Sequence, residues 1–317
     1  MAMELETKHN LEITLGPALD NTLGTMLVSI IVSASLFGAL TTQCHYYVIR
    51  FKQDPVWLKC IVAALWIIDG IHQIGVSAMI FQYSVHHYGD FEYLRQSSWL
   101  VSVCGILEPL PAFIVQIYFT RRLYYLNKKL WPVAAFTAIL SVISFAMGEA
   151  SSILTFTFSR FTESKGNTWL VIIWLVTCSV CDIAITIPVA WTLYTSRTGF
   201  KQTDVLLTRL ILWIVTTGAL PASFALLQVV TFTVMNESLI HLAANIVLVK
   251  LYSNTLLASL NRRGTLTKGR QGALHLSDNK ALSHAGLRPL LSLKKNPPAS
   301  NKDGLRQIQI TVTTHQY

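Results

Sequence analysis

Charged residues are scarce in this sequence. Only 13% of its 317 residues are Asp, Glu, Lys or Arg, whereas about 25% is typical of a soluble domain. Hydrophobic residues make up 52%, and most of them lie in long uninterrupted runs. The composition therefore excludes an ordinary soluble globular domain and favours a protein that buries most of its surface in lipid.

Motifs for catalysis and for metal binding are also missing. The sequence has no Gly-x-Ser-x-Gly nucleophile motif and no glycine-rich phosphate loop. Only His72 and His241 qualify as inward-facing histidines, fewer than a membrane-embedded zinc hydrolase needs, and the adjacent pair His86-His87 has weak ligand spacing. We therefore expect no enzyme, no metal site and no cofactor.

The five cysteines do not form a disulfide framework. Three of them, Cys104, Cys178 and Cys181, lie inside apolar runs. The Cys178-x-x-Cys181 spacing is typical of redox motifs, but no soluble βαβ pattern surrounds it. The spacing more simply predicts two small side chains on one helix face.

Seven long apolar runs dominate the chain. They cover about 22–47, 57–83, 98–119, 131–155, 168–194, 205–233 and 238–258. Each run has about the ~20 residues needed to cross a bilayer, and none shows the alternation of polar and apolar residues that is typical of a strand. Such runs must be helices, because lipid offers the backbone no hydrogen bonds. The sequence predicts an all-α membrane protein: an N-terminal tail (1–21), a bundle of seven transmembrane helices (22–258) and a disordered basic tail (259–317).

Lys and Arg are distributed unequally between the two sides of this bundle. The N-terminal tail and the loops after helices two, four and six hold four of them, whereas the other loops hold ten and the C-terminal tail ten more. Because basic residues are retained in the cytoplasm, we expect an outside N-terminus and a cytoplasmic C-terminus, in the plasma membrane or an endomembrane. The net charge of +9 then favours anionic lipid headgroups over nucleic acid as a partner.

Polar side chains interrupt the apolar runs of helices two, three, five and seven. Such residues cannot face lipid, so we expect them to converge on the bundle axis. One lysine cannot neutralise three central acids, which predicts either protonated carboxyls or a hydrated cavity. A ligand or proton site and a structural polar network both remain open. The candidate polar axis comprises Asp69, His72, Gln73, Glu108, Asp182, His241, Asn245 and Lys250.

Prolines and small residues give further local predictions. Pro109 and Pro111 predict a kink next to Glu108, and Pro188 and Pro221 predict kinks in helices five and six. In helix four, small residues at Ser144, Gly148 and Ser152 predict a line along which another helix approaches closely.

Two stretches near the C-terminal half resemble a known family. They are CDIAITIPVAWTLYTSRTGFKQTDVLLTRL (181–210), followed by TTGAL (216–220), and KLYSNTLLASLNRR (250–263). These motifs are similar to those of a large family of fungal, mostly basidiomycete, seven-helix integral membrane proteins known chiefly as a domain of unknown function. The resemblance covers roughly residues 20–263 and implies architecture, with no reaction to carry over.

The sequence leaves more than one function open. A receptor-like or sensor protein with an unidentified small-molecule ligand fits seven helices, an outside N-terminus and basic inner loops. However, Phe119-Thr-Arg-Arg-Leu123 lacks the acid-Arg-aromatic triplet of common G-protein-coupled receptors. A small-molecule or proton-coupled transporter or channel is the alternative, supported by midplane acids and proline-broken helices but by no internal repeat. We favour the receptor-like interpretation.

Overall fold

Every regular element in the part of the chain that the structure describes is a helix. The computed structural model describes residues 23–88, 93, 98–157, 168–197, 201–234 and 240–284. A π-helical turn (Gln82–His86) follows α3, and a short 3₁₀ turn (Lys128–Leu130) precedes α7. The long helices are α2 (Thr25–Arg50), α3 (Val56–Phe81), α5 (Trp99–Leu107), α6 (Pro109–Leu126), α7 (Trp131–Thr157), α8 (Thr168–Thr195), α9 (Lys201–Val234) and α10 (Ile240–His284). The predicted N-terminal tail, 1–21, lies outside the described residues.

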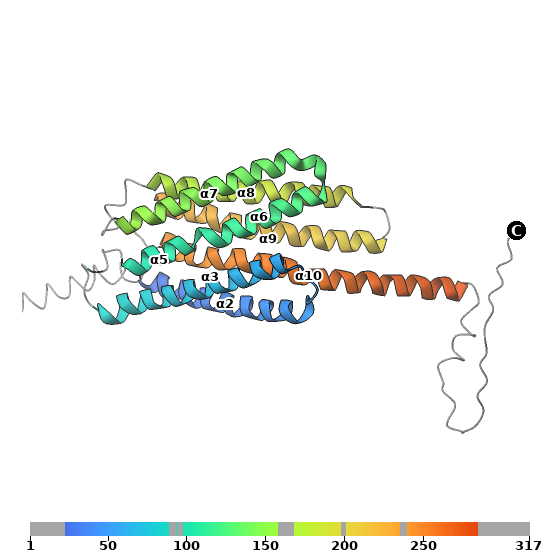
Figure 1. The fold of residues 1–317 in the computed structure, drawn as a ribbon, viewed down its shortest axis with the longest axis horizontal. Helices are drawn as coiled ribbons and strands as arrows, with labels where there is room; N and C mark the ends of the chain where they lie inside the picture. Colours follow the sequence, from blue (N-terminus) through green and yellow to red (C-terminus); the bar gives the residue numbers. More distant parts are fainter. Residues whose placement is uncertain are drawn as a thin grey trace, which may run out of the picture. The chain divides into compact units, whose positions relative to one another are not determined.

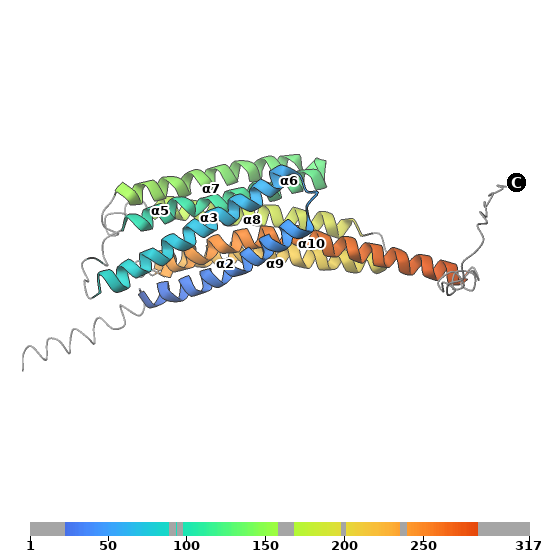
Figure 2. The ribbon, with the colours of Figure 1, turned by 60° about the horizontal axis from the view of Figure 1, so that its bottom comes forward.

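Seven spans in the described residues are long and apolar enough to cross a membrane, as the sequence predicted. They are Thr25–Arg50, Val56–His86, Trp99–Leu126, Lys128–Thr155, Trp169–Thr195, Leu207–Thr231 and Ile240–Arg263. The helices lie side by side along one common direction (Figures 1 and 2). Large apolar side chains such as Ile71, Ile74 and Leu212 point outward and are more than half exposed. A soluble protein would bury such faces, so these properties are those of an integral membrane protein.

The α10 helix is the most buried of the seven spans. Within the apolar window of Ile240–Arg263, 72% of residues are buried, against 22–50% in the other six. Its buried side chains contribute to two clusters, with Leu256, Leu257 and Leu260 in the larger one and Ile246 in the other. The buried polar side chains of this span, such as Asn245, Lys250 and Tyr252, therefore face other helices and not lipid.

The third span is broken where the prolines predicted a kink. α5 ends at Leu107 and α6 begins at Pro109, with Glu108 between them. Because Pro109 has no N–H, the Gly105 carbonyl accepts instead from the Glu108 N–H, at 3.3 Å. By contrast, α8 and α9 continue in helical conformation through Pro188 and Pro221.

The predicted line of small residues in α7 is a site of close helix approach. A Cβ atom at Gly148 would lie 2.7 Å from Pro109 Cγ and 3.0 Å from Trp174 Cε2. A Cβ atom at Gly105 would lie 3.2 Å from the hydroxyl of Ser152. The line therefore brings α7 against the α5–α6 span and against α8, and it helps to hold the broken third span in place.

The helical part of the chain extends beyond the predicted start of the tail. The sequence placed that start at residue 259, whereas α10 continues to His284. Residues 264–284 contain no proline, and four of them are leucines, which favour helix. The chain divides after Leu266 into two units, of which the bundle belongs to the first.

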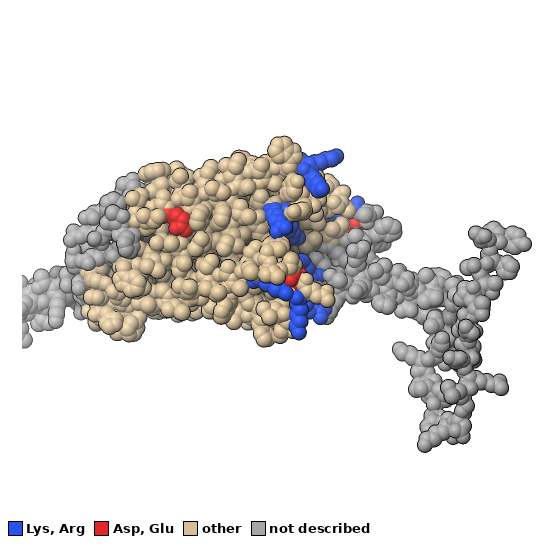
Figure 3. Space-filling model, viewed as in Figure 1, with Lys and Arg blue, Asp and Glu red and all other residues tan. Residues whose placement is uncertain are grey.

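Basic side chains gather at one end of the bundle (Figure 3). Because the helices alternate in direction, the ends of α2, α6 and α8 lie at the same end as the starts of α3, α7 and α9. Trp57 and Trp131 are exposed at this end, and Trp99 and Trp169 are exposed at the other. Such tryptophan belts are typical of the two membrane–water interfaces.

Candidate functional site

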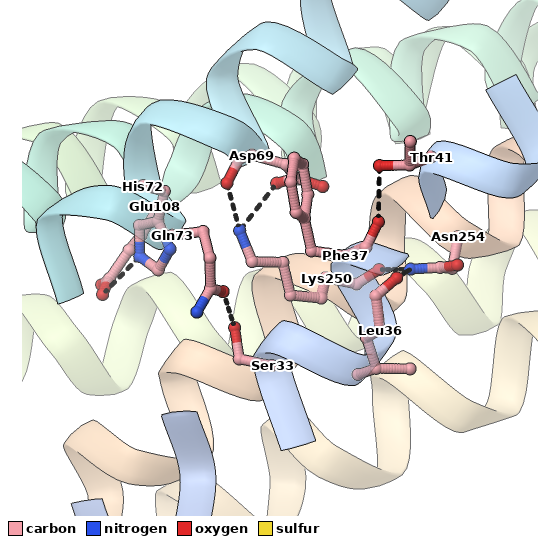
Figure 4. Close-up of polar contacts among 10 residues, drawn as sticks. All are labelled: Ser33, Leu36, Phe37, Thr41, Asp69, His72, Gln73, Glu108, Lys250 and Asn254. Carbon is pink, nitrogen blue, oxygen red and sulfur yellow. Dashed lines mark hydrogen bonds and ion pairs between the residues drawn. The ribbon is translucent and has the colours of Figure 1, made fainter. Parts of the chain in front are cut away.

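A buried ion pair connects α3 and α10 near the middle of the bundle. The ammonium Nζ of Lys250 lies 3.6 Å from Asp69 Oδ1 and donates a hydrogen bond of 2.6 Å to the Asp69 main-chain oxygen (Figure 4). Both side chains have no exposed surface. The ring of Phe37, with its centroid 5.7 Å from Nζ, covers the ammonium from α2. The buried Lys250 is therefore committed to one of the three central acids.

The second central acid, Glu108, lies between α3 and α10 at the break in the third span. Its Oε1 is 3.6 Å from His72 Nε2 (Figure 4). Its Oε2 accepts a hydrogen bond from the Asn245 side chain. His72 is one helical turn from Asp69 on α3. We call these five residues the axial cluster: Asp69, His72, Glu108, Asn245 and Lys250.

Several buried polar atoms in the axial cluster have no hydrogen-bond partner in the described structure. They include both carboxylate oxygens of Asp69 and both ring nitrogens of His72. Of these four atoms, Asp69 Oδ1 lies 3.6 Å from Lys250 Nζ and His72 Nε2 lies 3.6 Å from Glu108 Oε1. A network with only a structural role is expected to satisfy nearly all of its buried polar atoms. The unused hydrogen-bonding capacity, as at His72 Nδ1, leaves the axial cluster able to accept a proton or a small polar molecule.

Two other predicted site residues lie at the edges of this arrangement. Gln73 is half-buried and accepts a hydrogen bond of 2.7 Å from Ser33 of α2 (Figure 4). His241 lies one turn before Asn245 at the beginning of α10 and is also half-buried. Both side chains therefore lie in the same half of the bundle as Asn245.

Asp182 forms a separate set of contacts between α6, α8 and α10. Its Oδ1 accepts from Gln116 Nε2 at 3.0 Å, and its Oδ2 accepts from the Tyr252 hydroxyl at 2.7 Å. Cys178 Sγ lies 3.3 Å from the same hydroxyl. We call Gln116, Cys178, Asp182 and Tyr252 the Asp182 cluster. The sequence predicted one polar axis, whereas the structure divides it into two groups.

The geometry of α10 explains this division. At about 100° per residue, Lys250 and Tyr252 are about 200° apart, on opposite faces of the helix. Lys250 faces α3, and Tyr252 faces α6 and α8. Asn245 and Tyr252 are seven residues apart, on the same face. Asn245 donates to Glu108 of the third span, whereas Tyr252 donates to Asp182 of α8, which also accepts from Gln116 of the third span. The polar groups therefore extend about 10 Å along α10.

A small cavity adjoins the Asp182 cluster. It has a volume of about 40 Å³, enough for about three water molecules. Helices α6, α8, α9 and α10 all contribute to its wall. The polar side chains of that wall are Arg122, Asp182, Thr186, Thr217, Tyr252 and Thr255. The remaining lining residues have apolar side chains, apart from Gly218, which has none.

Tyr252 was not among the predicted site residues, although it bonds directly to Asp182. It lies within the run Lys250-Leu-Tyr252, where the neighbouring lysine is the more obvious polar residue. A tyrosine hydroxyl deep in an apolar span needs a partner, and this was the signal available in the sequence. The same reasoning applies to Gln116, whose side-chain amide lies deep in the third span, eight residues beyond Glu108, and also needs a partner.

The described residues hold no group of three or more His, Cys, Asp or Glu side chains able to bind a metal ion. Cys178 and Cys181 are both buried, and neither is in a disulfide. Cys178 belongs to the Asp182 cluster, whereas Cys181 donates to the Thr137 main-chain oxygen at 3.4 Å. The two thiols therefore have different partners and separate structural surroundings.

The second half of the bundle contains the part of the chain that is similar to a known family. Residues 178–265 match a family of unknown function, DUF6534. The matched segment runs from Cys178 in α8 through α9 and into α10 as far as residue 265, so it includes Asp182, Lys250 and Tyr252. It overlaps the two stretches whose resemblance the sequence indicated. No curated protein and no solved structure matches the chain.

Proposed function

We propose that the chain is a receptor-like membrane sensor in which α10 connects the axial cluster to the cytoplasmic end of the bundle. The proposal assigns no reaction to the protein and leaves its small-molecule ligand unidentified. One observation carries it: the same buried helix holds Lys250 at the axial cluster and Arg263 at the basic end. The two residues are thirteen positions apart, about 20 Å along the helix.

The contacts at the basic end support this role for α10. Arg263 Nη2 lies 2.6 Å from Asp54 Oδ2 in the loop between α2 and α3. Asn261 donates to the Gln43 main-chain oxygen at 2.9 Å, and Arg122 of α6 donates to Ser259 at 2.9 Å. A rigid helix tied at both places can transmit a shift at the axial cluster to the loop next to Asp54.

The orientation that we propose follows from the distribution of charge. The end of the bundle with the basic side chains (Figure 3) faces the cytoplasm. There, the Arg121 guanidinium stacks on Trp57, with Cζ 4.2 Å from the ring centroid, and lies near Tyr125. An arginine held by aromatic rings at the interface is well suited to contact anionic lipid headgroups.

Hydrogen exchange on the full chain in nanodiscs tests the coupling. Asp69→Asn removes the charge that pairs with Lys250 while keeping the shape of the side chain. We expect at least about threefold faster amide exchange in residues 51–55 and 258–263, because α10 relaxes as one rigid unit. Glu149→Gln on α7 removes an acid that is outside both clusters and is the matched control. Changes confined to the neighbourhood of residue 69 would disprove the coupling.

Proton-coupled transport is a second candidate because of the position of Glu108. This acid lies at a break in a membrane span, and broken helices are typical of the sites of secondary transporters. Proteoliposomes with an entrapped pH-sensitive dye measure the flux directly under an imposed pH gradient. Proton flux that is lost in Glu108→Gln would favour transport, whereas no flux above empty vesicles would favour the sensor.

A further inference from the structure

Arg122 on α6 is a half-buried cation without an acidic partner among the described residues. Its Nη1 donates to the neutral Ser259 hydroxyl at 2.9 Å, and the described residues give it no ion pair. That bond uses one of the five N–H donors of a guanidinium. Because buried charges are normally paired with a charge of opposite sign, Arg122 is left able to bind an anion.

Asp182 does not supply that anion, although it lines the same mostly apolar cavity as Arg122. Its Oδ1 accepts from Gln116 at 3.0 Å and its Oδ2 accepts from Tyr252 at 2.7 Å. Gln116 lies six residues before Arg122 on α6, about 9 Å further from the basic end. The carboxylate is therefore held away from the guanidinium, and an anion for Arg122 has to come from elsewhere.

Three arginines lie near Tyr118 at the basic end, with a single acid to oppose them. The positive charges of Arg121, Arg122 and Arg263 all act on the Tyr118 side chain. The opposing charge is that of Asp54, which already accepts from Arg263 at 2.6 Å. Three positive charges against one negative charge leave a surplus of two. We call Tyr118, Arg121, Arg122 and Arg263 the Tyr118 cluster.

The Tyr118 cluster lies at the depth of a membrane–water interface. The rings of Trp57 and Tyr118 have centroids 6.5 Å apart, and the Arg121 guanidinium lies 4.2 Å from the Trp57 centroid. Other exposed aromatic residues, such as Tyr125 and Trp131, belong to the same end of the bundle, where the basic side chains gather (Figure 3). Tryptophan and tyrosine prefer the level of the lipid headgroups, so headgroups supply an anion at the level of these arginines.

We infer that the Tyr118 cluster binds the phosphomonoester group of a lipid headgroup, such as that of a phosphorylated inositol lipid, in the leaflet at the basic end. The planar fork of a guanidinium matches two phosphate oxygens. Tyr118 contacts Trp57 and Phe119 through its ring, and its hydroxyl is left, among the described residues, to donate to a third oxygen. A phosphomonoester carries about two negative charges at neutral pH, which equals the surplus of the cluster.

The inference deepens the headgroup contact proposed for Arg121 and rests on that part of the proposed function. It uses neither the axial cluster nor the coupling through α10. Loss of the coupling in Asp69→Asn would leave the lipid selectivity unchanged, whereas loss of the lipid selectivity would leave the coupling unchanged.

Thermal unfolding of the full chain in nanodiscs tests the inference, because a ligand that binds only the folded state raises the melting temperature. Phosphatidylcholine nanodiscs are titrated with phosphatidylinositol monophosphate or with phosphatidylserine, and the two midpoints are compared on the scale of lipid charge. We expect the midpoint for the phosphomonoester lipid to be at least about tenfold lower, because it forms charge-assisted bonds with the arginine fork. Inorganic phosphate, added to nanodiscs of phosphatidylcholine alone, should stabilise the protein far less.

Two variants and one control identify the ligands. Arg122→Gln should raise the midpoint for phosphatidylinositol monophosphate by at least about tenfold, and Tyr118→Phe by about threefold, because each removes a hydrogen bond to a charged group. Lys129→Gln removes an exposed charge at the same end, in the turn before α7, and should change the midpoint by less than about twofold. If Arg122→Gln does not fold, Tyr118→Phe decides, together with Arg122→Lys, which keeps the charge but loses the fork.

Three results would overturn the inference. The first is the same midpoint for both lipids, which would reduce the contact to a general attraction by basic side chains. The second is an equal effect of Arg122→Gln and Lys129→Gln. The third is stabilisation by inorganic phosphate that matches the lipid and is abolished in Arg122→Gln, which would assign the site to a soluble anion.

Discussion

Lys250 Nζ lies 3.6 Å from Asp69 Oδ1 with both side chains fully buried, and this pair connects the second and seventh spans. Removing two charges from water costs several kcal/mol for each, and only a close partner offsets that cost. Lys250 meets the requirement twice, since it also donates to the Asp69 main-chain oxygen at 2.6 Å. The position of α10 in the bundle therefore depends on this pair.

Lys250→Met should destabilise the protein strongly. The methionine is close to lysine in length but leaves the Asp69 carboxylate buried without its cation, and breaking such a pair costs about 3–5 kcal/mol. Thermal unfolding in nanodiscs measures the loss. The double variant Lys250→Met with Asp69→Asn should recover more than half of it, because no unpaired charge remains. A single variant as stable as the wild type would show that Asp69 does not depend on Lys250.

Gly148→Ala should loosen the contact between α7 and the third span. The added Cβ would lie 2.7 Å from Pro109 Cγ, so the helices must separate, and such overpacking typically costs about 1–3 kcal/mol. The matched control is Gly38→Ala on α2, where a Cβ meets nothing within 4 Å. Unfolding temperatures should fall for the first variant and stay level or rise for the second. Equal behaviour of the two variants would contradict the close approach.

The contact at the basic end should depend on Asp54 more than on Arg263. Asp54 Oδ2 accepts from both Arg263 and the hydroxyl of Tyr47, at 2.6 and 2.9 Å. Arg263→Gln should cost at most about 1 kcal/mol, because the Arg263 side chain is 42% exposed. Asp54→Ala also strands the Tyr47 hydroxyl and should cost about 1–3 kcal/mol. Adding Tyr47→Phe to Asp54→Ala should then restore part of the stability, and an additive double variant would refute the shared acceptor.

The proposed orientation gives a prediction for intact cells. A reporter fused after Tyr317 should be cytosolic, and protease added outside should reach only the N-terminal tail and the loops near residues 90 and 163. Those loops lie outside the described residues. Cleavage of the C-terminal tail from outside would reverse the orientation and the direction of sensing.

The fold could be predicted from the sequence to a large extent because lipid imposes local rules. A run of apolar residues must be helical to satisfy its backbone, so the seven spans follow from hydropathy alone. The break at Glu108 followed from two prolines, and the close approach along Ser144, Gly148 and Ser152 followed from residue size. Each of these features depends on neighbours in sequence. The seventh membrane span ends at Arg263, but the helix itself continues to His284, because a change of composition does not by itself end a helix.

Partners across helices could be settled only by the tertiary structure. Spacing on one helix shows that Asp69 and His72 share a face, but it does not show which acid Lys250 meets. That choice depends on how each helix is rotated about its own axis, which is determined by contacts between residues 70 to 181 positions apart. The rotation of α10 directs Lys250 to Asp69 and Tyr252 to Asp182. Lys250 and Tyr252 thus divide one predicted axis into two sites, because side chains two positions apart on a helix point in nearly opposite directions.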